Sequence, residues 1–206
     1  VTGLTWTQSA DWSGDGTVNV NDKFTYAQAQ TYVGTLNTQA YGGYTDWRMP
    51  STKELYSLID FTGTDPNPTA SSSAGLTPFI DSTVFQFGYG DISAGERVID
   101  SQWVASTIYV GTVMGGQEAM FGVNFADGRI KGYPTTTGMD YYARFVRGNE
   151  SYGDNAFADN GDGTITDSAT ELMWTQDDNA TGVNWEDALA WVDAKNAEGY
   201  LGHDDW

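Results

Sequence analysis

Apolar and aromatic positions recur at helical spacing between residues 24 and 36. The positions that fall near one helix face are Phe24, Ala27, Val33 and Leu36. This spacing predicts a helix that turns one face toward a core. The glycine pair Gly42-Gly43 ends the region, since paired glycines interrupt regular structure.

A second helix is predicted immediately after residue 50. Ser51 and Glu54 have the spacing of a capping box, in which each side chain accepts a hydrogen bond from the backbone amide of the other residue. Leu55, Leu58 and Ile59 then supply the apolar stripe that faces a core.

Beyond residue 60 the pattern changes from helical spacing to turns and short strands. Residues 62–78 are rich in proline, serine, threonine and glycine, which predicts a long loop. Runs of aromatic and β-branched residues predict strands at 102–110, 119–125, 129–133 and 141–146. Ala126-Asp127-Gly128 has the composition of a hairpin turn between two of them. The expected fold class is α+β, with two helices, short antiparallel strands and long loops.

The chain also repeats itself. Residues 2–8 (TGLTWTQ) align with residues 170–176 (TELMWTQ) at an offset of 168 positions. Two further pairs align at an offset of 159 positions: residues 25–29 with 184–188, and residues 43–47 with 202–206. The first copy therefore holds nine extra residues between Gln8 and Thr25. An insertion at the start of a helix is a place where a functional loop is tolerated.

The repeat divides the chain into two predicted parts. Residues 1–148 form a near-complete module, and residues 149–206 form a linker followed by the opening third of a second copy. The second copy includes residues 155–168, where Asp162-Gly163 predicts a hairpin turn, and the first copy has no counterpart of this segment. The chain begins within the pattern at Val1, so we interpret it as a mature product or a fragment of a longer protein.

The segment between Gln8 and Thr25, which holds these extra residues, contains the most specific chemistry in the sequence. Residues 11–22 (DWSGDGTVNVND) place oxygen side chains at positions 1, 3, 5, 9 and 12 of a twelve-residue loop. Glycine stands at position 6, where a calcium loop turns sharply, and position 7 would bind through its carbonyl. With aspartate at position 12, the segment resembles a dockerin-type loop; the alternative is a polar turn that binds nothing. The predicted Ca²⁺ ligands are Asp11, Ser13, Asp15, Thr17, Asn19 and Asp22.

Other acidic positions are weaker candidates. Residues 159–167 (DNGDGTITD) resemble the loop in composition, but placing Gly163 at position 6 leaves alanines at both end positions, so a β-hairpin is predicted instead. Asp91 and Glu96 are candidates for a second calcium or ligand site, with a surface loop as the default interpretation. Trp12, inside the calcium loop, either offers a ring on which a sugar stacks or packs over the loop.

Composition excludes several classes of function. The net charge is −19, from 28 acidic and 9 basic residues, which argues against nucleic-acid binding and against anionic glycans unless calcium bridges them. The chain has no cysteine, which removes disulfides and thiol chemistry. His203 is the only histidine, so a serine-histidine-aspartate triad or a histidine-rich zinc site is not expected. No apolar stretch approaches the ~20 residues of a membrane span.

Several motifs occur in the order typical of one family. Residues 43–55 (GYTDWRMPSTKEL), 103–107 (WVAST), 123–128 (VNFADG) and 143–148 (ARFVRG) together resemble the Lcl C-terminal domain family. The resemblance implies a C-type-lectin-like fold in exported bacterial surface proteins with adhesive or binding roles. It also implies a buried Trp47, a buried Arg48 and a capped helix, and it transfers no ligand site. Formylglycine-generating enzymes share this fold, but their chemistry needs cysteines, so no enzyme is expected.

Two functions fit these observations. The first is a calcium-stabilised extracellular module for binding or adhesion, with a glycan or a surface protein as ligand. The second is a structural subunit of a surface filament or matrix, assembled head-to-tail through the incomplete second copy. Apolar residues of that copy would then be exposed as an interaction surface. The residues expected to be exposed are Leu172, Met173, Trp174, Trp185 and Trp191.

Overall fold

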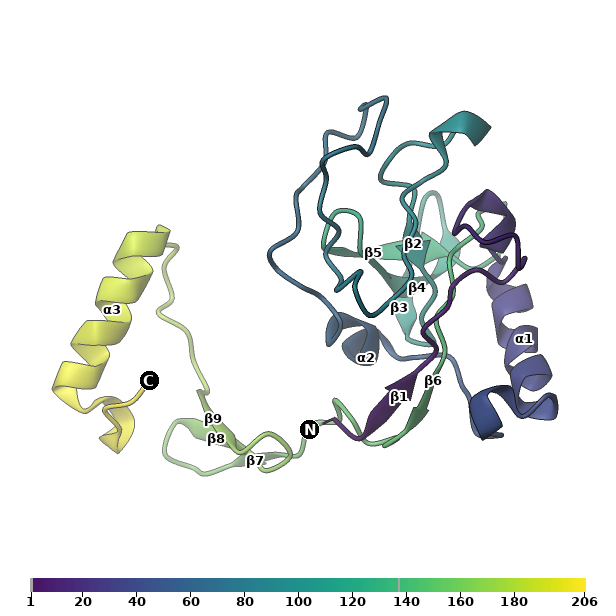
Figure 1. Cartoon of the computed structure of the whole chain (residues 1–206). Helices are drawn as coiled ribbons and strands as arrows, with labels where there is room; N and C mark the ends of the chain where they lie inside the picture. Colours follow the sequence, from purple (N-terminus) through teal and green to yellow (C-terminus); the bar gives the residue numbers. More distant parts are fainter. Residues whose placement is uncertain (1, 137) are drawn as a thin grey trace. The chain divides into compact units, whose positions relative to one another are not determined.

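The computed structural model describes residues 2–136 and 138–206. The chain divides into two compact units, Val1–Tyr152 and Gly153–Trp206, which are called unit 1 and unit 2 (Figure 1). The expected α+β class with antiparallel sheets is confirmed in this part of the chain. The described residues contain three α-helices, one more than the sequence predicted, because the second copy forms a helix of its own.

The largest sheet of unit 1 has four antiparallel strands. These are β2 (Gln102–Trp103), β3 (Ile108–Val113), β4 (Gln117–Asn124) and β5 (Arg129–Pro134). Strand β4 pairs with each of the other three, and the predicted turn at residues 126–128 connects it to β5. The predicted strand at 102–110 is wrong as a single run. Its middle leaves the sheet because Val104 and Ser106 donate to the carbonyls of Tyr142 and Pro50.

Two helices and a second, two-stranded sheet complete unit 1. Helix α1 (Tyr26–Thr38) starts at a capping box on Thr25, and helix α2 (Thr52–Tyr56) starts at the predicted capping box on Ser51. Strand β1 (Leu4–Trp6) pairs with β6 (Val146–Gly148), which joins the two ends of the unit. The predicted strand at 141–146 is wrong except at its last residue, because Tyr141 and Tyr142 make only isolated bridges and β6 begins at Val146. Short 3₁₀ turns of unit 1 are η1 (Val20–Asp22), η2 (Tyr41–Gly43) and η3 (Ile92–Ala94), and one more, η4 (Tyr200–Gly202), belongs to unit 2.

The core of unit 1 contains a buried cation. The Arg144 side chain donates to the carbonyls of Thr7, Gln8 and Gln86, and its guanidinium lies 4.9 Å from the centroid of the Trp103 ring. Burial lowers the pKa of Arg144 to about 9. Arg144 thus ties the N-terminal segment to the long loop that precedes β2.

Unit 2 is a three-stranded antiparallel sheet followed by a helix. The strands are β7 (Phe157–Asp159), β8 (Thr164–Asp167) and β9 (Leu172–Thr175), and the helix is α3 (Trp185–Glu198). The hairpin predicted within residues 155–168 is confirmed as β7 and β8. Of the residues expected to be exposed, Trp174 is 52% and Trp185 73% exposed, and Leu172 and Met173 are also exposed. Trp191 is half-buried instead, since its ring packs against that of Tyr200.

The repeat in the sequence is also a repeat of hydrogen bonds. The side chain of Asn37 bonds both the amide and the carbonyl of Trp47, at 2.7 and 2.9 Å. Asn196 makes the same two bonds with Trp206, at 3.1 and 2.8 Å. In both copies the indole nitrogen then donates to the carbonyl six residues earlier, at 2.9 Å. Unit 2 therefore reproduces the helix-to-tryptophan segment of unit 1 atom for atom at these contacts.

The stability of unit 2 should decline in acid because of Asp167. The backbone amide of Ala156 and the side chain of Asn155 donate to its carboxylate, and this lowers its pKa from 3.8 to about 2. A lowered folded-state pKa contributes stability above the unfolded value that is lost as pH falls toward the folded value. We expect the β7–β9 amides to lose protection between about pH 4 and pH 2, as measured by hydrogen exchange. Asp167→Asn should lower protection at pH 7 and flatten this dependence; an unchanged pH profile would contradict the assignment.

Candidate metal centre and adjoining cleft

The structure gathers the six predicted ligands of the calcium loop into one closed turn. Gly14 and Gly16 have φ angles of 76° and 91°, in the left-handed region that favours glycine. Both positions have open space where a Cβ would stand, so the backbone angle rather than crowding calls for glycine. The chain therefore reverses direction where the sequence predicted.

Asp11 organises the first half of the turn. Its Oδ1 accepts from the amides of Gly14 and Asp15 at 2.7 and 3.1 Å, and its Oδ2 accepts from the amide of Gly16 at 2.9 Å. The Ser13 hydroxyl also donates to Oδ1, at 3.3 Å. These bonds hold a carboxylate at the centre of the turn.

Asp15 organises the second half. The Thr17 amide and hydroxyl donate to its Oδ1 at 2.9 and 2.8 Å, and the Asn19 side chain donates to Oδ2 at 3.0 Å. The hydrogen bond from Asn19, followed by those from Thr17, lowers the pKa of Asp15 from 3.8 to about 2. The group is therefore ionised at neutral pH, as a metal ligand must be.

Asp22 closes the turn from inside the protein. The residue is buried, its Oδ1 accepts from the Ser13 amide at 2.7 Å, and its Oδ2 accepts from the Asn19 amide at 2.8 Å. One carboxylate thus joins both arms of the turn. A carboxylate has about four lone-pair sites, so each oxygen of Asp22 keeps one for a further partner.

The donor set fits a hard cation. Three carboxylates, a hydroxyl, an amide oxygen and a backbone carbonyl make an all-oxygen set, which is the ligand chemistry that Ca²⁺ prefers. Among residues 2–136 and 138–206, no three His, Cys, Asp or Glu side chains lie close enough to form a metal group by themselves. A cation held at this turn would therefore need the neutral oxygens of Ser13, Thr17 and Asn19 as well as the carboxylates.

Two side chains of the turn anchor it to the core. The Trp12 indole donates to the carbonyl of Ala143 at 2.9 Å, and its ring lies edge-on to those of Tyr32 and Phe145. Trp12 therefore packs into the core of unit 1, rather than over the loop or as an open platform for a sugar. Val18 packs against the core cluster that contains Leu55, Trp103 and Phe125, and a Cβ at Gly88 would approach the Val18 carbonyl to 2.4 Å.

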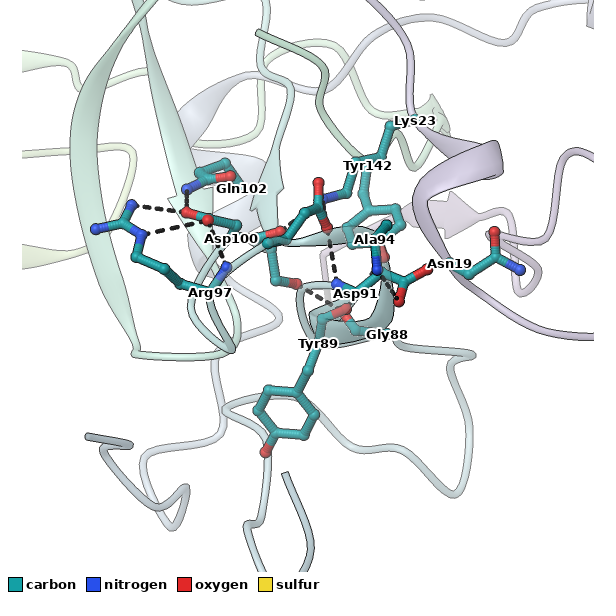
Figure 2. Close-up of polar contacts among 12 residues, drawn as sticks. Asn19, Lys23, Gly88, Tyr89, Asp91, Ala94, Arg97, Asp100, Gln102 and Tyr142 are labelled. Carbon is teal, nitrogen blue, oxygen red and sulfur yellow. Dashed lines mark hydrogen bonds and ion pairs between the residues drawn. The ribbon is translucent and has the colours of Figure 1, made fainter. Parts of the chain in front are cut away.

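A buried lysine joins the turn to the loop at residues 88–101, as Figure 2 shows. The Lys23 ammonium donates to both carboxylate oxygens of Glu96 at 2.7 Å and to the carbonyl of Asp100 at 2.6 Å. It also lies 4.7 Å from the centroid of the Tyr142 ring. Lys23 was not among the predicted site residues, and its place directly after the last predicted ligand was the only available signal.

The proposed second calcium site at Asp91 and Glu96 finds no support in this geometry. Glu96 is neutralised by Lys23 and also accepts from the backbone amide of Asp91, at 2.7 Å. The Asp91 side chain instead accepts from Ser93 and Ala94, and so caps the short turn η3. The two carboxylates therefore serve different partners.

A cleft of about 370 Å³ lies between the calcium loop and this second loop. Its lining residues are Val18, Asn19, Ser72, Ser73, Tyr89, Gly90, Asp91 and Ile92. Asn19 belongs to both features, since it is a predicted calcium ligand and also lines the cleft. The Tyr89 hydroxyl is buried and makes no hydrogen bond within the described residues.

Residues 1–147 match the family described as the Lcl C-terminal domain. The chain belongs to this family. The match includes the calcium loop and both walls of the cleft and ends at the closing strand β6. Comparison with curated proteins found no match, and comparison with solved structures found none either.

The motif at residues 43–55 is architectural in this Lcl C-terminal domain. Trp47 is buried, as expected, in a core cluster with Leu36 and Phe145. Arg48 is only partly buried, and its guanidinium makes two bonds to the carboxylate of Glu54, at 2.7 and 2.6 Å. Glu54 also completes the capping box with Ser51, so the motif fixes the start of α2 rather than a ligand site.

Proposed function

We propose that the chain is a calcium-stabilised binding module of the bacterial cell surface, which acts in adhesion. The observation that carries the proposal is the closed turn at residues 11–22, whose six predicted ligands supply only oxygen atoms. The domain would have a C-type-lectin-like fold and an extracellular location, in keeping with the implications of the family resemblance. It would have no enzymatic activity.

Calcium would act by ordering one wall of the cleft. Asp11, Ser13, Asp15, Thr17, Asn19 and Asp22 would hold the ion. Asn19 also lines the cleft, so fixing its side chain would fix that part of the cleft wall. Lys23 would connect the loop to the opposite wall through its salt bridge to Glu96. The ligand is expected to be a neutral polar molecule such as an uncharged glycan, because the net charge of −19 repels anions. A surface protein is the other ligand class that fits.

Terbium luminescence tests the calcium site. Tb³⁺ replaces Ca²⁺ at oxygen sites, and Trp12 lies inside the loop as an energy donor, so tryptophan excitation should sensitise terbium emission. Asp15→Ala should abolish most of this emission because it removes an ionised ligand. The matched control is Asp81→Ala, an exposed aspartate with similar Thr hydrogen bonds outside the loop. Equal emission from both variants would show that residues 11–22 do not bind the ion.

A second candidate function is a structural subunit of a surface filament or matrix. The exposed aromatic residues of unit 2 favour it, because apolar surface of this kind commonly marks an interaction site. A glycan array distinguishes the two functions. Specific, calcium-dependent sugar binding supports the adhesion module, whereas no sugar binding together with self-association in light scattering supports the subunit.

No helix among the described residues is both long and apolar enough to cross a membrane.

A further inference from the structure

Strand β3 lies at one edge of the four-stranded sheet in unit 1. Within the part of the chain that the structure describes, β3 pairs with β4 alone, and no strand lies along its other edge. The Phe121 amide donates to the Thr107 carbonyl, so the backbone groups of Thr107 turn toward β4. Because hydrogen-bonding residues alternate along an antiparallel strand, the amide and the carbonyl of Ile108 turn to the open edge.

The pairing of β3 with β4 is irregular in its middle. The ladder advances by four residues along β3, from Ile108 to Thr112. Over the same distance it advances by only two residues along β4, from Met120 to Glu118. An irregularity of this kind leaves backbone groups of the longer strand unpaired. The open edge of β3 therefore offers hydrogen-bonding groups beyond those of Ile108.

The exposed side chains of β3 are all β-branched. Val110 is fully exposed, Ile108 is 52% exposed, and Thr112 is exposed as well. Exposed and half-buried residues alternate along the strand, so these three side chains share one face. Pairs of β-branched side chains on adjacent strands pack against each other and stabilise a sheet.

The two edges of this sheet differ in their protection against another chain. Strand β5, which pairs with β4 alone, carries Arg129, Lys131 and Pro134. Charged residues and proline are the means by which natural edge strands avoid pairing with a second molecule. Strand β3 has neither, and residues 101–117 contain no charged residue. In a chain of net charge −19, such a stretch lets two copies meet without direct repulsion between charged side chains.

We propose that β3 pairs with β3 of a second copy of this chain, antiparallel, with Val110 on the two-fold axis. Val110 would then lie opposite Val110 of the other copy, and Ile108 would lie opposite Thr112. The added strand would contribute backbone hydrogen bonds along the edge, as in other cases of strand addition. Each copy uses the same surface, so the contact closes at two chains and does not propagate.

The size of the contact sets its strength. Two strands of six residues form a small interface, and small interfaces give weak, transient complexes. We therefore expect a dimer that forms only at high protein concentration. The contact uses neither the calcium loop nor the aromatic residues of unit 2, so it is independent of both functions proposed above.

Oppositely charged variants at Val110 test the pairing and its register. Val110→Glu and Val110→Lys each place like charges opposite each other across the axis. Each variant alone should dimerise about tenfold more weakly than the unmodified chain in analytical ultracentrifugation. An equal mixture of the two should recover the dimer, because unlike charges then face each other. Neither variant should change the melting temperature, since Val110 is fully exposed.

Matched variants at Val84 provide the control. Val84 is 48% exposed and lies in unit 1 outside every strand, so Val84→Glu and Val84→Lys should dimerise like the unmodified chain. In amide hydrogen exchange, Ile108 should gain protection as the protein concentration rises. The proposal is overturned by a chain that stays monomeric up to about 1 mM, or by association that Val110→Glu leaves unchanged. A mixture of the Val110 variants that associates no better than either alone would also overturn it.

Discussion

Replacing Arg144 by alanine should destabilise unit 1 more than any other single substitution considered for this chain. The change removes a buried guanidinium and leaves the carbonyls of Thr7 and Gln86 without this donor, while the carbonyl of Gln8 keeps the hydrogen bond from the Gln86 amide. Each buried acceptor left unpaired costs about 1–3 kcal/mol, and the cavity adds to this cost. We expect the free energy of unfolding to fall by about 3–5 kcal/mol, as measured by urea denaturation.

An exposed arginine of the same unit provides the control. Arg97 pairs with Asp100 at 2.7 Å, but its side chain is 60% exposed. Exposed ion pairs of this kind contribute about 0–1 kcal/mol, so Arg97→Ala should leave the denaturation midpoint nearly unchanged. If both variants lost equal stability, the carbonyl cluster around Arg144 would not have the role that its geometry indicates.

Calcium should raise the thermal stability of unit 1 through residues 11–22. An ion that binds only the folded state adds about 2.7 kcal/mol at one hundred times its dissociation constant. Melting curves of the chain with calcium and with chelator should therefore separate. Asp22→Ala should remove this separation, and it should also lower the melting temperature without metal, because Asp22 joins both arms of the turn.

Asp91→Ala tests whether the calcium-dependent rise in melting temperature requires the predicted ligands or any acidic side chain nearby. Asp91 lines the adjoining cleft but is outside the predicted ligand set. This variant should keep the full calcium-dependent shift in melting temperature. Identical melting curves of the unmodified chain with calcium and with chelator would count against a structural ion.

Local sequence signals predicted the elements that depend on neighbouring residues. The capping box at Ser51, the turn at residues 126–128 and the hairpin within residues 155–168 all follow from short-range hydrogen bonds, and all are present. The closed turn at residues 11–22 is of the same kind, since its aspartates accept from amides at most nine residues away.

Elements fixed by distant partners were not predictable in this way. The run at 141–146 has the composition of a strand, yet its backbone bonds several segments in turn, including Phe24, Gln102 and Thr7. The salt bridge from Lys23 to Glu96 joins residues 73 positions apart, so no local sequence pattern predicts it. The same holds for the cleft, whose walls come from three separate loops.

The pairing of β1 with β6 also decides how unit 1 responds to mechanical force. Gly3 and Asn149 lie opposite each other at the same end of this antiparallel pair, where the Asn149 amide donates to the Gly3 carbonyl. Tension applied through the neighbouring chain segments would pull these two residues apart across the pair. The hydrogen bonds would then break one after another, as in a zipper, rather than together, as in shear. Tension would therefore open this domain from its ends inward, and Val146, opposite Trp6, is the first buried residue of β6 that this opening would reach.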